Sequence, residues 1–143
     1  MSSMSKFFKQ NKAIRENTFF PATKSLLDDD GKPLTWEIKP LTTKEDEVIR
    51  DSCTMEIQIP GKPGMYRNKL NTNAYIGKLI VASVVEPDLY NAELQDSYNV
   101  NTPEDLVKEI VDDPGEYTAF MAFIQNFNGF NVTLQEEIDE VKN

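Results

Sequence analysis

The side chains that could carry chemistry in this 143-residue chain are 24 carboxylates, one thiol (Cys53) and no imidazole. Hydrolases with a Ser-His-Asp or Cys-His arrangement need an imidazole base, so the composition excludes them. A pair of carboxylates could still act as general acid and base. However, the acids fall at the starts of expected helices, where capping and the helix dipole explain them. We therefore expect no enzymatic activity, no catalytic residue and no cofactor.

Metal binding and thiol chemistry are also disfavoured. With one cysteine the chain has no internal disulfide and no thiolate zinc site, and without histidine Cys53 has no activating base. We expect a half-buried structural thiol. Three aspartates, Asp28–Asp30, precede Gly31, but a calcium loop of the EF-hand type would place an acid where Leu26 stands. These aspartates are assigned to a turn, and no metal site is expected.

The charge is strongly uneven along the chain. The net charge is −9, yet residues 1–15 carry +4, while the stretch Glu86–Glu116 carries −9 with Lys108 as its one base. Such an acidic stretch is either a solvated surface or a face that attracts a basic partner, and the basic N-terminus of the chain itself is one such partner. The acidic balance argues against nucleic acid as a partner.

No segment is predicted to span a membrane or to direct secretion. The longest apolar run, Leu79–Val85, has seven residues and contains Ser83, whereas a bilayer-spanning helix needs about 20. Residues 4–14 place apolar side chains on one face of a short helix with lysines around it. We interpret residues 1–17 as an amphipathic arm that docks on the body or on a partner, and we expect a cytoplasmic protein.

Strand signals gather in the first half of the chain. Residues 19–27 and 34–41 flank the Asp-Gly turn of Asp28–Pro33, which favours a β-hairpin. In its second arm, Leu34, Trp36 and Ile38 alternate with polar residues, so this face is expected to be buried. The segment 55–66 indicates a loop or a loose hairpin around two Pro-Gly pairs.

Helix signals dominate from residue 42 onward. A capping box at Thr42 opens one helix, and residues 73–86 are so apolar that they predict a buried helix, with a strand over 80–85 as the alternative. Four more helix starts follow, at Asn91, Thr102, Asp113 and Thr133. The fold class predicted is α+β: an N-terminal β-hairpin followed by a cluster of short α-helices, mostly helical, with residues 18–143 forming a single domain.

The last two predicted helices contain the candidate binding residues. Tyr117, Phe120, Phe123, Phe127 and Phe130 are more aromatic residues than one helical stripe needs. Phe123 lies off the Phe120–Phe127 face, so both core packing and an exposed patch for a partner stay open. The final helix adds a narrow apolar stripe of Leu134, Ile138 and Val141.

Several strings of the chain, taken together, resemble the XkdN-like family of tail assembly chaperones from contractile-tailed phages and PBSX-type prophages. The strings are FFKQN (7–11), WEIKPLTTKEDEVIRDSCT (36–54), EPDLYNAELQDSYNV (86–100), PGEY (114–117) and NFNGF (126–130), followed by an acidic tail. They fall in register over nearly the whole chain. One departure is Asn99, where a glycine is expected, although asparagine tolerates the same left-handed backbone conformation.

The resemblance implies a non-enzymatic protein that binds the tape measure protein, keeps it soluble during tail assembly, and helps recruit tail tube subunits. It also implies action in the cytoplasm of the bacterial host and absence from the mature virion. The alternative is a structural tail component that stays in the particle, and a homo-oligomer is left open. The candidate partner-binding residues are inferred from their apolar character alone: Phe123, Phe127, Phe130, Leu134, Ile138 and Val141.

Overall fold

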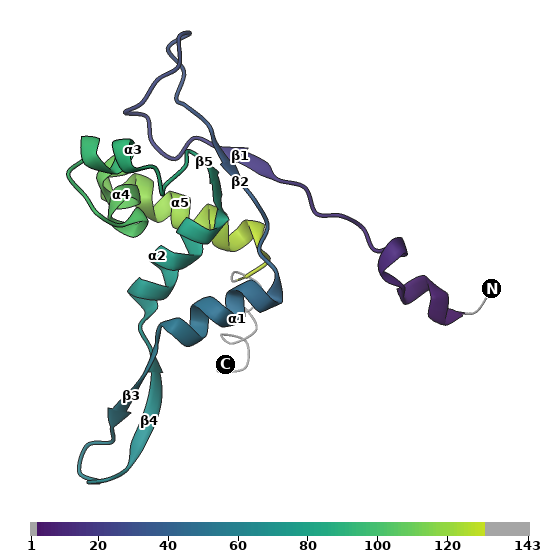
Figure 1. Ribbon diagram of the computed structural model, residues 1–143, viewed down its shortest axis with the longest axis vertical. Coiled ribbons are helices and arrows are strands. Elements are labelled where there is room, and N and C mark those ends of the chain that lie inside the picture. Colours follow the sequence, from purple (N-terminus) through teal and green to yellow (C-terminus); the bar gives the residue numbers. More distant parts are fainter. Residues whose placement is uncertain (1–2, 131–143) are drawn as a thin grey trace, which may run out of the picture.

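The computed structural model describes residues 3–130 and confirms the α+β class, with 45% of the structure helical and 16% in strands (Figure 1). The expectation that helices make up most of the chain is therefore wrong. Along the chain the elements are β1 (Thr18–Phe20), β2 (Trp36–Ile38), α1 (Thr43–Ser52), β3 (Thr54–Gln58), β4 (Tyr66–Leu70), α2 (Thr72–Ser83), β5 (Val84–Glu86), α3 (Ala92–Ser97), α4 (Pro103–Ile110) and α5 (Pro114–Phe127).

The main sheet has three short antiparallel strands in the order β1-β2-β5. The prediction of a separate N-terminal hairpin is wrong. Its two arms pair over only three residues each, and β5, from much later in the chain, completes the sheet. Leu34, expected on the buried face, is exposed because β2 begins only at Trp36. The Asp28 turn is confirmed, since its carboxylate accepts hydrogen bonds from the backbone N–H groups of Asp30 and Lys32.

Helix α2 lies at the centre of the body and packs against α1, α4 and α5. Leu79 and Ile80 on this helix are almost fully buried, which confirms the expected central helix. The helix ends at Ser83, three residues before the predicted end, because Val84–Glu86 pair with β2 instead. Around α2 the core is completed by Trp36, Ile38, Leu106, Phe120 and Ile124.

The predicted helix starts within the described residues are confirmed. Thr42 forms a reciprocal capping box with Glu45 at the start of α1. Asn91, Thr102 and Asp113 each accept a backbone N–H from the first turn of the helix that follows. These caps fix where α3, α4 and α5 begin.

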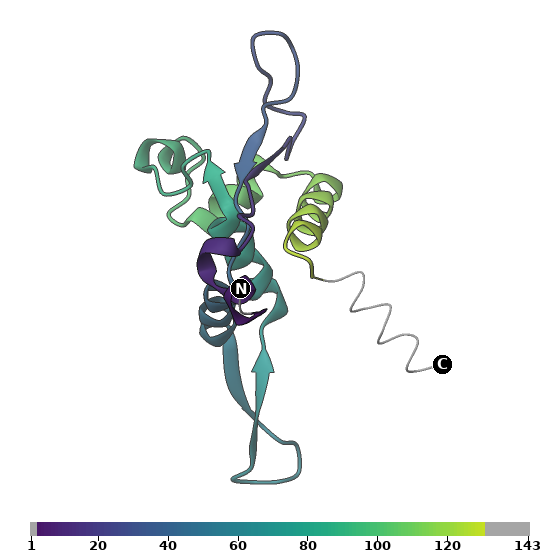
Figure 2. The ribbon, with the colours of Figure 1, turned by 90° about the vertical axis from the view of Figure 1, so that its right-hand side faces the viewer.

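Three segments project from this body. The two-stranded ribbon β3–β4 and the loop between β1 and β2 lie at opposite ends of the long axis (Figure 2). The ribbon confirms the hairpin expected at 55–66. The third projection is the N-terminal segment, where two short 3-10 turns, Ser3–Phe7 and Lys9–Asn11, replace the single amphipathic helix that the pattern indicated. None of the helices within residues 3–130 is long and apolar enough to cross a bilayer.

Candidate partner-binding surface

The three predicted binding residues that the structure describes lie along one side of α5 and just beyond its end. Asp113 caps this helix, and its buried face carries Phe120 and Ile124. Phe123, Phe127 and Phe130 are half-buried and pack against the core, so each ring keeps only part of its surface in solvent. Leu134, Ile138 and Val141 lie outside the described residues. The structure thus brings three of the six candidates together.

Phe20 on β1 extends this row of rings and was missed by the sequence reasoning. Its ring stacks on Phe123 with centroids 4.2 Å apart and on Phe120 with centroids 5.8 Å apart. Phe123 in turn stacks on Phe127 at 6.1 Å. We call Phe20, Phe123 and Phe127 the ring row. It joins the first strand to the last described helix and leaves an apolar rim at the edge of the body.

The C-terminal end of α5 is held in place by polar contacts with the segment before α1. Asn128 accepts the backbone N–H of Leu41 at 2.7 Å, and its amide group donates to the carbonyl of Ile124 at 2.9 Å. Gly129 adopts a positive φ of 76°, and Phe130 then donates its N–H to Gln125 O at 2.9 Å. The position of Phe130 is therefore set by a closed helix terminus.

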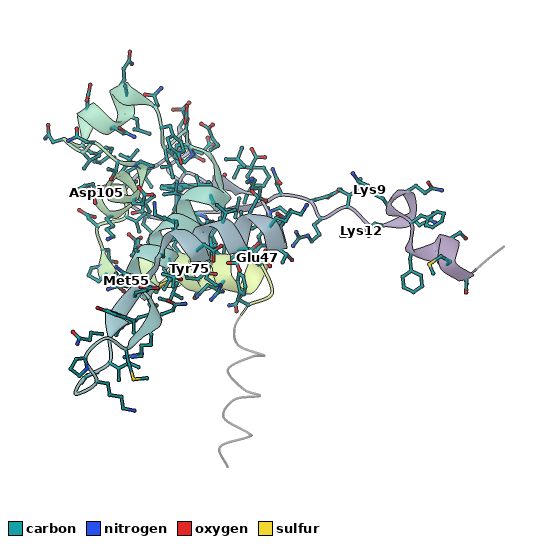
Figure 3. The ribbon with its side chains drawn as sticks, turned by 60° about the horizontal axis from the view of Figure 1, so that its bottom comes forward. Lys9, Lys12, Glu47, Met55, Tyr75 and Asp105 are labelled. Atoms are coloured by element: carbon teal, nitrogen blue, oxygen red, sulfur yellow. The ribbon has the colours of Figure 1, made fainter. Side chains whose placement is uncertain are left out.

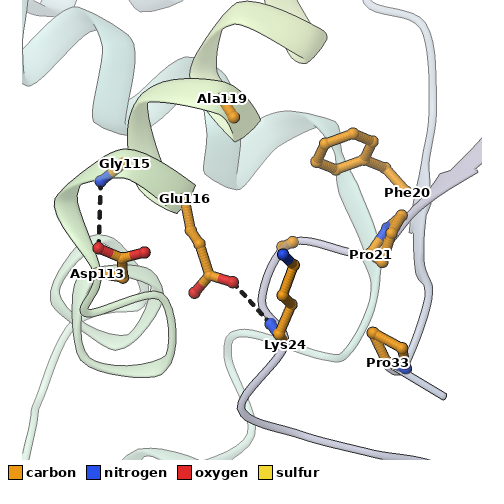
Figure 4. A pocket seen from close by; sticks show the side chains of 9 residues that line it. Phe20, Pro21, Lys24, Pro33, Asp113, Gly115, Glu116 and Ala119 are labelled. Atoms are coloured by element: carbon orange, nitrogen blue, oxygen red, sulfur yellow. Dashed lines mark hydrogen bonds between the residues drawn. The ribbon is translucent and has the colours of Figure 1, made fainter.

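A cavity of about 340 Å³ opens beside the ring row, between the segment after β1 and the start of α5 (Figure 4). Glu116 and Asp113 line it, but both carboxylates already bind protein groups. Glu116 accepts the Lys24 N–H and the Thr23 hydroxyl, each at 2.8 Å, and these bonds hold the pKa of Glu116 below its usual value. A general acid needs a raised pKa, so this carboxylate is suited to fixing the loop to α5.

Tyr75 is the centre of a second polar group, at the contact between α1 and α2. Its hydroxyl donates to Asp46 and accepts from Arg50 at 3.1 Å, and the Arg50 guanidinium lies 4.7 Å from the ring centroid. Burial, followed by the hydrogen bond to Asp46, raises the pKa of Tyr75 to about 12. The phenol is therefore protonated at neutral pH, and the group joins two helices.

Cys53 at the end of α1 is buried, more deeply than the half-buried thiol that was expected. Its sulfur lies 3.6 Å from the Ser52 hydroxyl. Within residues 3–130 no group of three or more acidic or cysteine side chains is arranged so that it could hold a metal ion. The surfaces with exposed apolar side chains are thus the features that most clearly suit binding.

The ribbon β3–β4 presents one such surface. Its register pairs Met55 with Lys69 and Ile57 with Arg67, and the N–H of Ile59 continues the pairing to Met65 O at 2.9 Å. Because side chains alternate across a strand, one face gathers these residues while the opposite face carries mainly polar ones. We define Met55, Ile57, Ile59, Met65, Arg67 and Lys69 as the ribbon face. The alternating residues at 55, 57 and 59 were a signal for it in the sequence.

The N-terminal segment presents a second surface (Figure 3). Phe7 and Ile14 are 84% and 90% exposed, respectively, and neither 3-10 turn buries a residue. The segment is attached where Arg15 donates to Leu41 O at 2.6 Å and Asn17 donates to Glu37 at 2.8 Å. Lys9 and Lys12 extend into solvent beyond this attachment.

Comparison with known proteins places this architecture in a family. The model of the phage XkdN-like tail assembly chaperone proteins matches residues 4–142. The phage-like element PBSX protein XkdN of Bacillus subtilis (strain 168) is 26% identical over 139 residues, which cover 96% of this chain and 92% of that protein. Protein YqbN of the same strain is 23% identical over 149 residues, which cover 94% and 98% of the two chains.

The fold has also been seen in a crystal structure. The crystal structure of YqbN superposes with a TM-score of 0.75 at 20% identity, and the match covers 92% of this chain and 99% of the other. At this identity the superposition shows a shared fold alone. The family match, in contrast, extends over almost the entire sequence and agrees with the resemblance found in it. The chain belongs to the phage XkdN-like tail assembly chaperone family.

Proposed function

We propose that this protein binds the tape measure protein of its phage or prophage and keeps it soluble until the tail tube surrounds it. The observation that carries the proposal is the family match over residues 4–142. Under this proposal the protein acts in the cytoplasm of the bacterial host, helps recruit tail tube subunits, and is absent from the finished particle.

Two physical properties of the chain suit this role. A long, largely helical partner with uncovered apolar faces aggregates, so its chaperone needs an apolar contact surface and a means to keep the complex in solution. The net charge of −9 helps to keep the complex in solution. The apolar contact surface comes from apolar side chains that lie on the projecting segments and not in the core.

The ribbon face is the surface that we propose for the partner contact. It is long and narrow, and Met55 and Met65, both exposed, are unbranched and adaptable, which favours binding to apolar stripes of varied shape. A two-stranded ribbon is only marginally stable alone in water, so a partner that covers one face would also stabilise it. Arg67 and Lys69 on the same face add attraction for acidic residues that flank such stripes.

The ring row and Phe130 remain the second proposed contact, as predicted from the sequence. Their rings are half-buried against the core, so they can offer a rim but not a fully exposed patch. Phe127 is the best residue for testing this surface. Within residues 3–130, Phe123 is stacked between two other rings, whereas Phe127 stacks on Phe123 alone.

The test is co-expression of the full chain with the tape measure protein encoded in the same tail gene cluster, scored for both co-purification and solubility of the partner. We expect the native chain to bring the partner into the soluble fraction. Met55→Ser combined with Met65→Ser should reduce this recovery several-fold, whereas the matched control Gln58→Ser with Asn68→Ser, on the opposite face of the ribbon, should not.

Two results would contradict the proposal. A well-folded native chain that leaves the tape measure protein insoluble and unbound would remove its basis. Detection of this chain in purified particles at the copy number of a structural subunit would favour the alternative, a tail component retained in the virion. Phe127→Ser then separates the two surfaces: recovery lost in this variant, but kept in the double methionine variant, would assign the contact to the ring row.

A further inference from the structure

The N-terminal segment, residues 3–14, is built like a ligand for another surface. We call it the arm. It carries Lys6, Lys9 and Lys12 and no acid, and none of these lysines makes an ion pair within residues 3–130. Its apolar side chains, Phe7 and Ile14 foremost, lie in solvent. A segment that exposes large apolar groups between unpaired cations is typical of one that becomes ordered against an acidic, apolar partner.

The body offers a complementary surface. An apolar cavity of about 330 Å³ lies between the β1–β2 loop, the end of β5, and helices α3 and α4. Leu26, Trp36, Leu94 and Ile110 contribute its apolar walls, and Glu86 lies at its edge. Its volume is at the lower end of the range of about 300–1,000 Å³ for small-ligand pockets, which suits one large side chain of a docked segment.

One acidic residue, Glu86, lines this cavity, and further acids are sequence neighbours of its lining residues. Half of its lining residues come from the stretch Glu86–Glu116, whose charge of −9 opposes the positive charge of the arm. Glu93 and Glu109 are exposed and directly precede the lining residues Leu94 and Ile110, and neither makes an ion pair within the part of the chain that the structure describes. Lys108 is the one base of the stretch. We define Glu86, Glu93 and Glu109 as the rim. These acids, together with the apolar walls, match the apolar side chains between lysines in the arm.

The arm and the helices α3 and α4, which contribute to the cavity, lie on opposite sides of the body (Figure 1). The bonds from Arg15 to Leu41 O and from Asn17 to Glu37 direct the arm out of the body on the side opposite α3 and α4 (Figure 1). The arm would have to reverse its direction to reach the cavity of its own body. A second copy can meet it without any such change.

We propose that the arm of one copy docks in the acidic, apolar cavity of a second copy, with Phe7 in the cavity and the arm lysines facing the rim. Because donor and acceptor surfaces are different, the contact is head-to-tail, and it repeats from copy to copy into a ring or an open chain. The interface is small, so we expect weak association with a dissociation constant in the range of about 10–100 μM. This proposal does not depend on the identity of the tail protein that the family member serves.

The first experiment is sedimentation velocity of the full chain from about 5 to 500 μM, a range that brackets the expected dissociation constant. The native chain should shift from monomer to larger species with increasing concentration, and added salt should reverse the shift because screening weakens the attraction of exposed charges. Lys9→Glu with Lys12→Glu should weaken association roughly tenfold or more. The matched control, Lys62→Glu with Lys69→Glu, makes the same charge change on the ribbon and should not.

A mixing experiment then tests whether the arm of one copy contacts the rim of another. Glu93→Lys with Glu109→Lys reverses the rim of the cavity, and this variant should not associate with itself. An equimolar mixture of the rim-reversed and arm-reversed variants should associate again, because each arm then meets a rim of opposite charge. Phe7→Ser should weaken association, whereas Phe19→Ser, an exposed phenylalanine outside the arm, should not.

Three outcomes would overturn the proposal. One is a native chain that stays monomeric up to the highest concentration, and another is arm reversal that leaves association unchanged. The third is a native chain that stays monomeric while its arm-reversed variant fails to keep the tape measure protein soluble. The arm would then bind the tape measure protein and not a second copy of this chain. Circular dichroism spectra equal to that of the native chain would show that each variant is folded.

Discussion

Replacement of Phe20 by alanine should destabilise the protein strongly, whereas the same change at its neighbour Phe19 should not. The two residues are adjacent on β1 and their side chains point to opposite faces of the sheet. Phe20 stacks on Phe120 and Phe123, while Phe19 is 61% exposed. The pair therefore provides a change of identical chemistry at a packed and an unpacked position.

The magnitude follows from what Phe20 contacts. A fully buried phenylalanine costs about 3–5 kcal/mol when it is truncated to alanine, and each aromatic pair contributes about 0.5–1.5 kcal/mol beyond its buried area. Phe20 is only half-buried, so we expect a loss of about 2–3 kcal/mol in the free energy of unfolding. Phe19→Ala should stay within about 0.5 kcal/mol of the native chain.

Urea unfolding followed by tryptophan fluorescence measures this difference directly. The single tryptophan, Trp36, is 2% exposed and lies 5.3 Å from Phe120 in an edge-to-face arrangement, so its emission reports on the core that Phe20 covers. With an m-value of about 1–3 kcal/mol per molar urea, the midpoint should fall by roughly 1–2 M in Phe20→Ala. Equal losses in the two variants, or a loss below about 0.5 kcal/mol in Phe20→Ala, would refute the assigned packing.

Three further changes test the polar contacts. Tyr75→Phe removes the bond to Asp46 and should cost about 1–2 kcal/mol in urea unfolding at neutral pH. Because the folded state holds the pKa of Tyr75 near 12, against 10.0 ordinarily, the native chain should lose stability as pH rises from 10 to 12, and this loss should be smaller in Tyr75→Phe. Glu116→Gln should flatten the loss of stability below pH 4.5, since the lowered pKa of Glu116 stabilises the fold only while the carboxylate is charged. Thr42→Ala should cost about 1 kcal/mol by opening the capping box of α1, measurable as a lower urea midpoint.

Local chemistry made the helices predictable. Each start depends on a side chain two or three residues from the backbone N–H that it caps, so the relevant information lies within one turn of the sequence. The same holds for Gly129 at the end of α5 and for Asn99, which adopts a φ of 57° as expected for a tolerated left-handed residue. The predicted amphipathic N-terminal helix is wrong: the short segment forms 3-10 turns instead, and Phe7 and Ile14 on its apolar side lie in solvent, so little burial stabilises a helix there.

Contacts between distant residues decided what the sequence could not show. Residues 80–85 are apolar except for Ser83, so their pattern does not determine where α2 ends and β5 begins. Pairing with β2 determines it. The candidate site shows the same limit. Phe123 and Phe127 were recognised on one helix, but the stacking of Phe123 on Phe20 joins residues about a hundred positions apart, and no local pattern signals it.

The β3–β4 ribbon is joined to the body at one place, so it can change independently of the body. Cys53 and Asn71 flank the ribbon, and the N–H of Asn71 donates to Cys53 O at 2.8 Å, so the two points of attachment are already bonded to each other. A change in the length or sequence of the ribbon therefore enters and leaves the body at this one bonded pair of residues, while α1 and α2 keep their packing. A change of partner preference that is confined to the exposed residues of the ribbon therefore leaves the core residues unchanged.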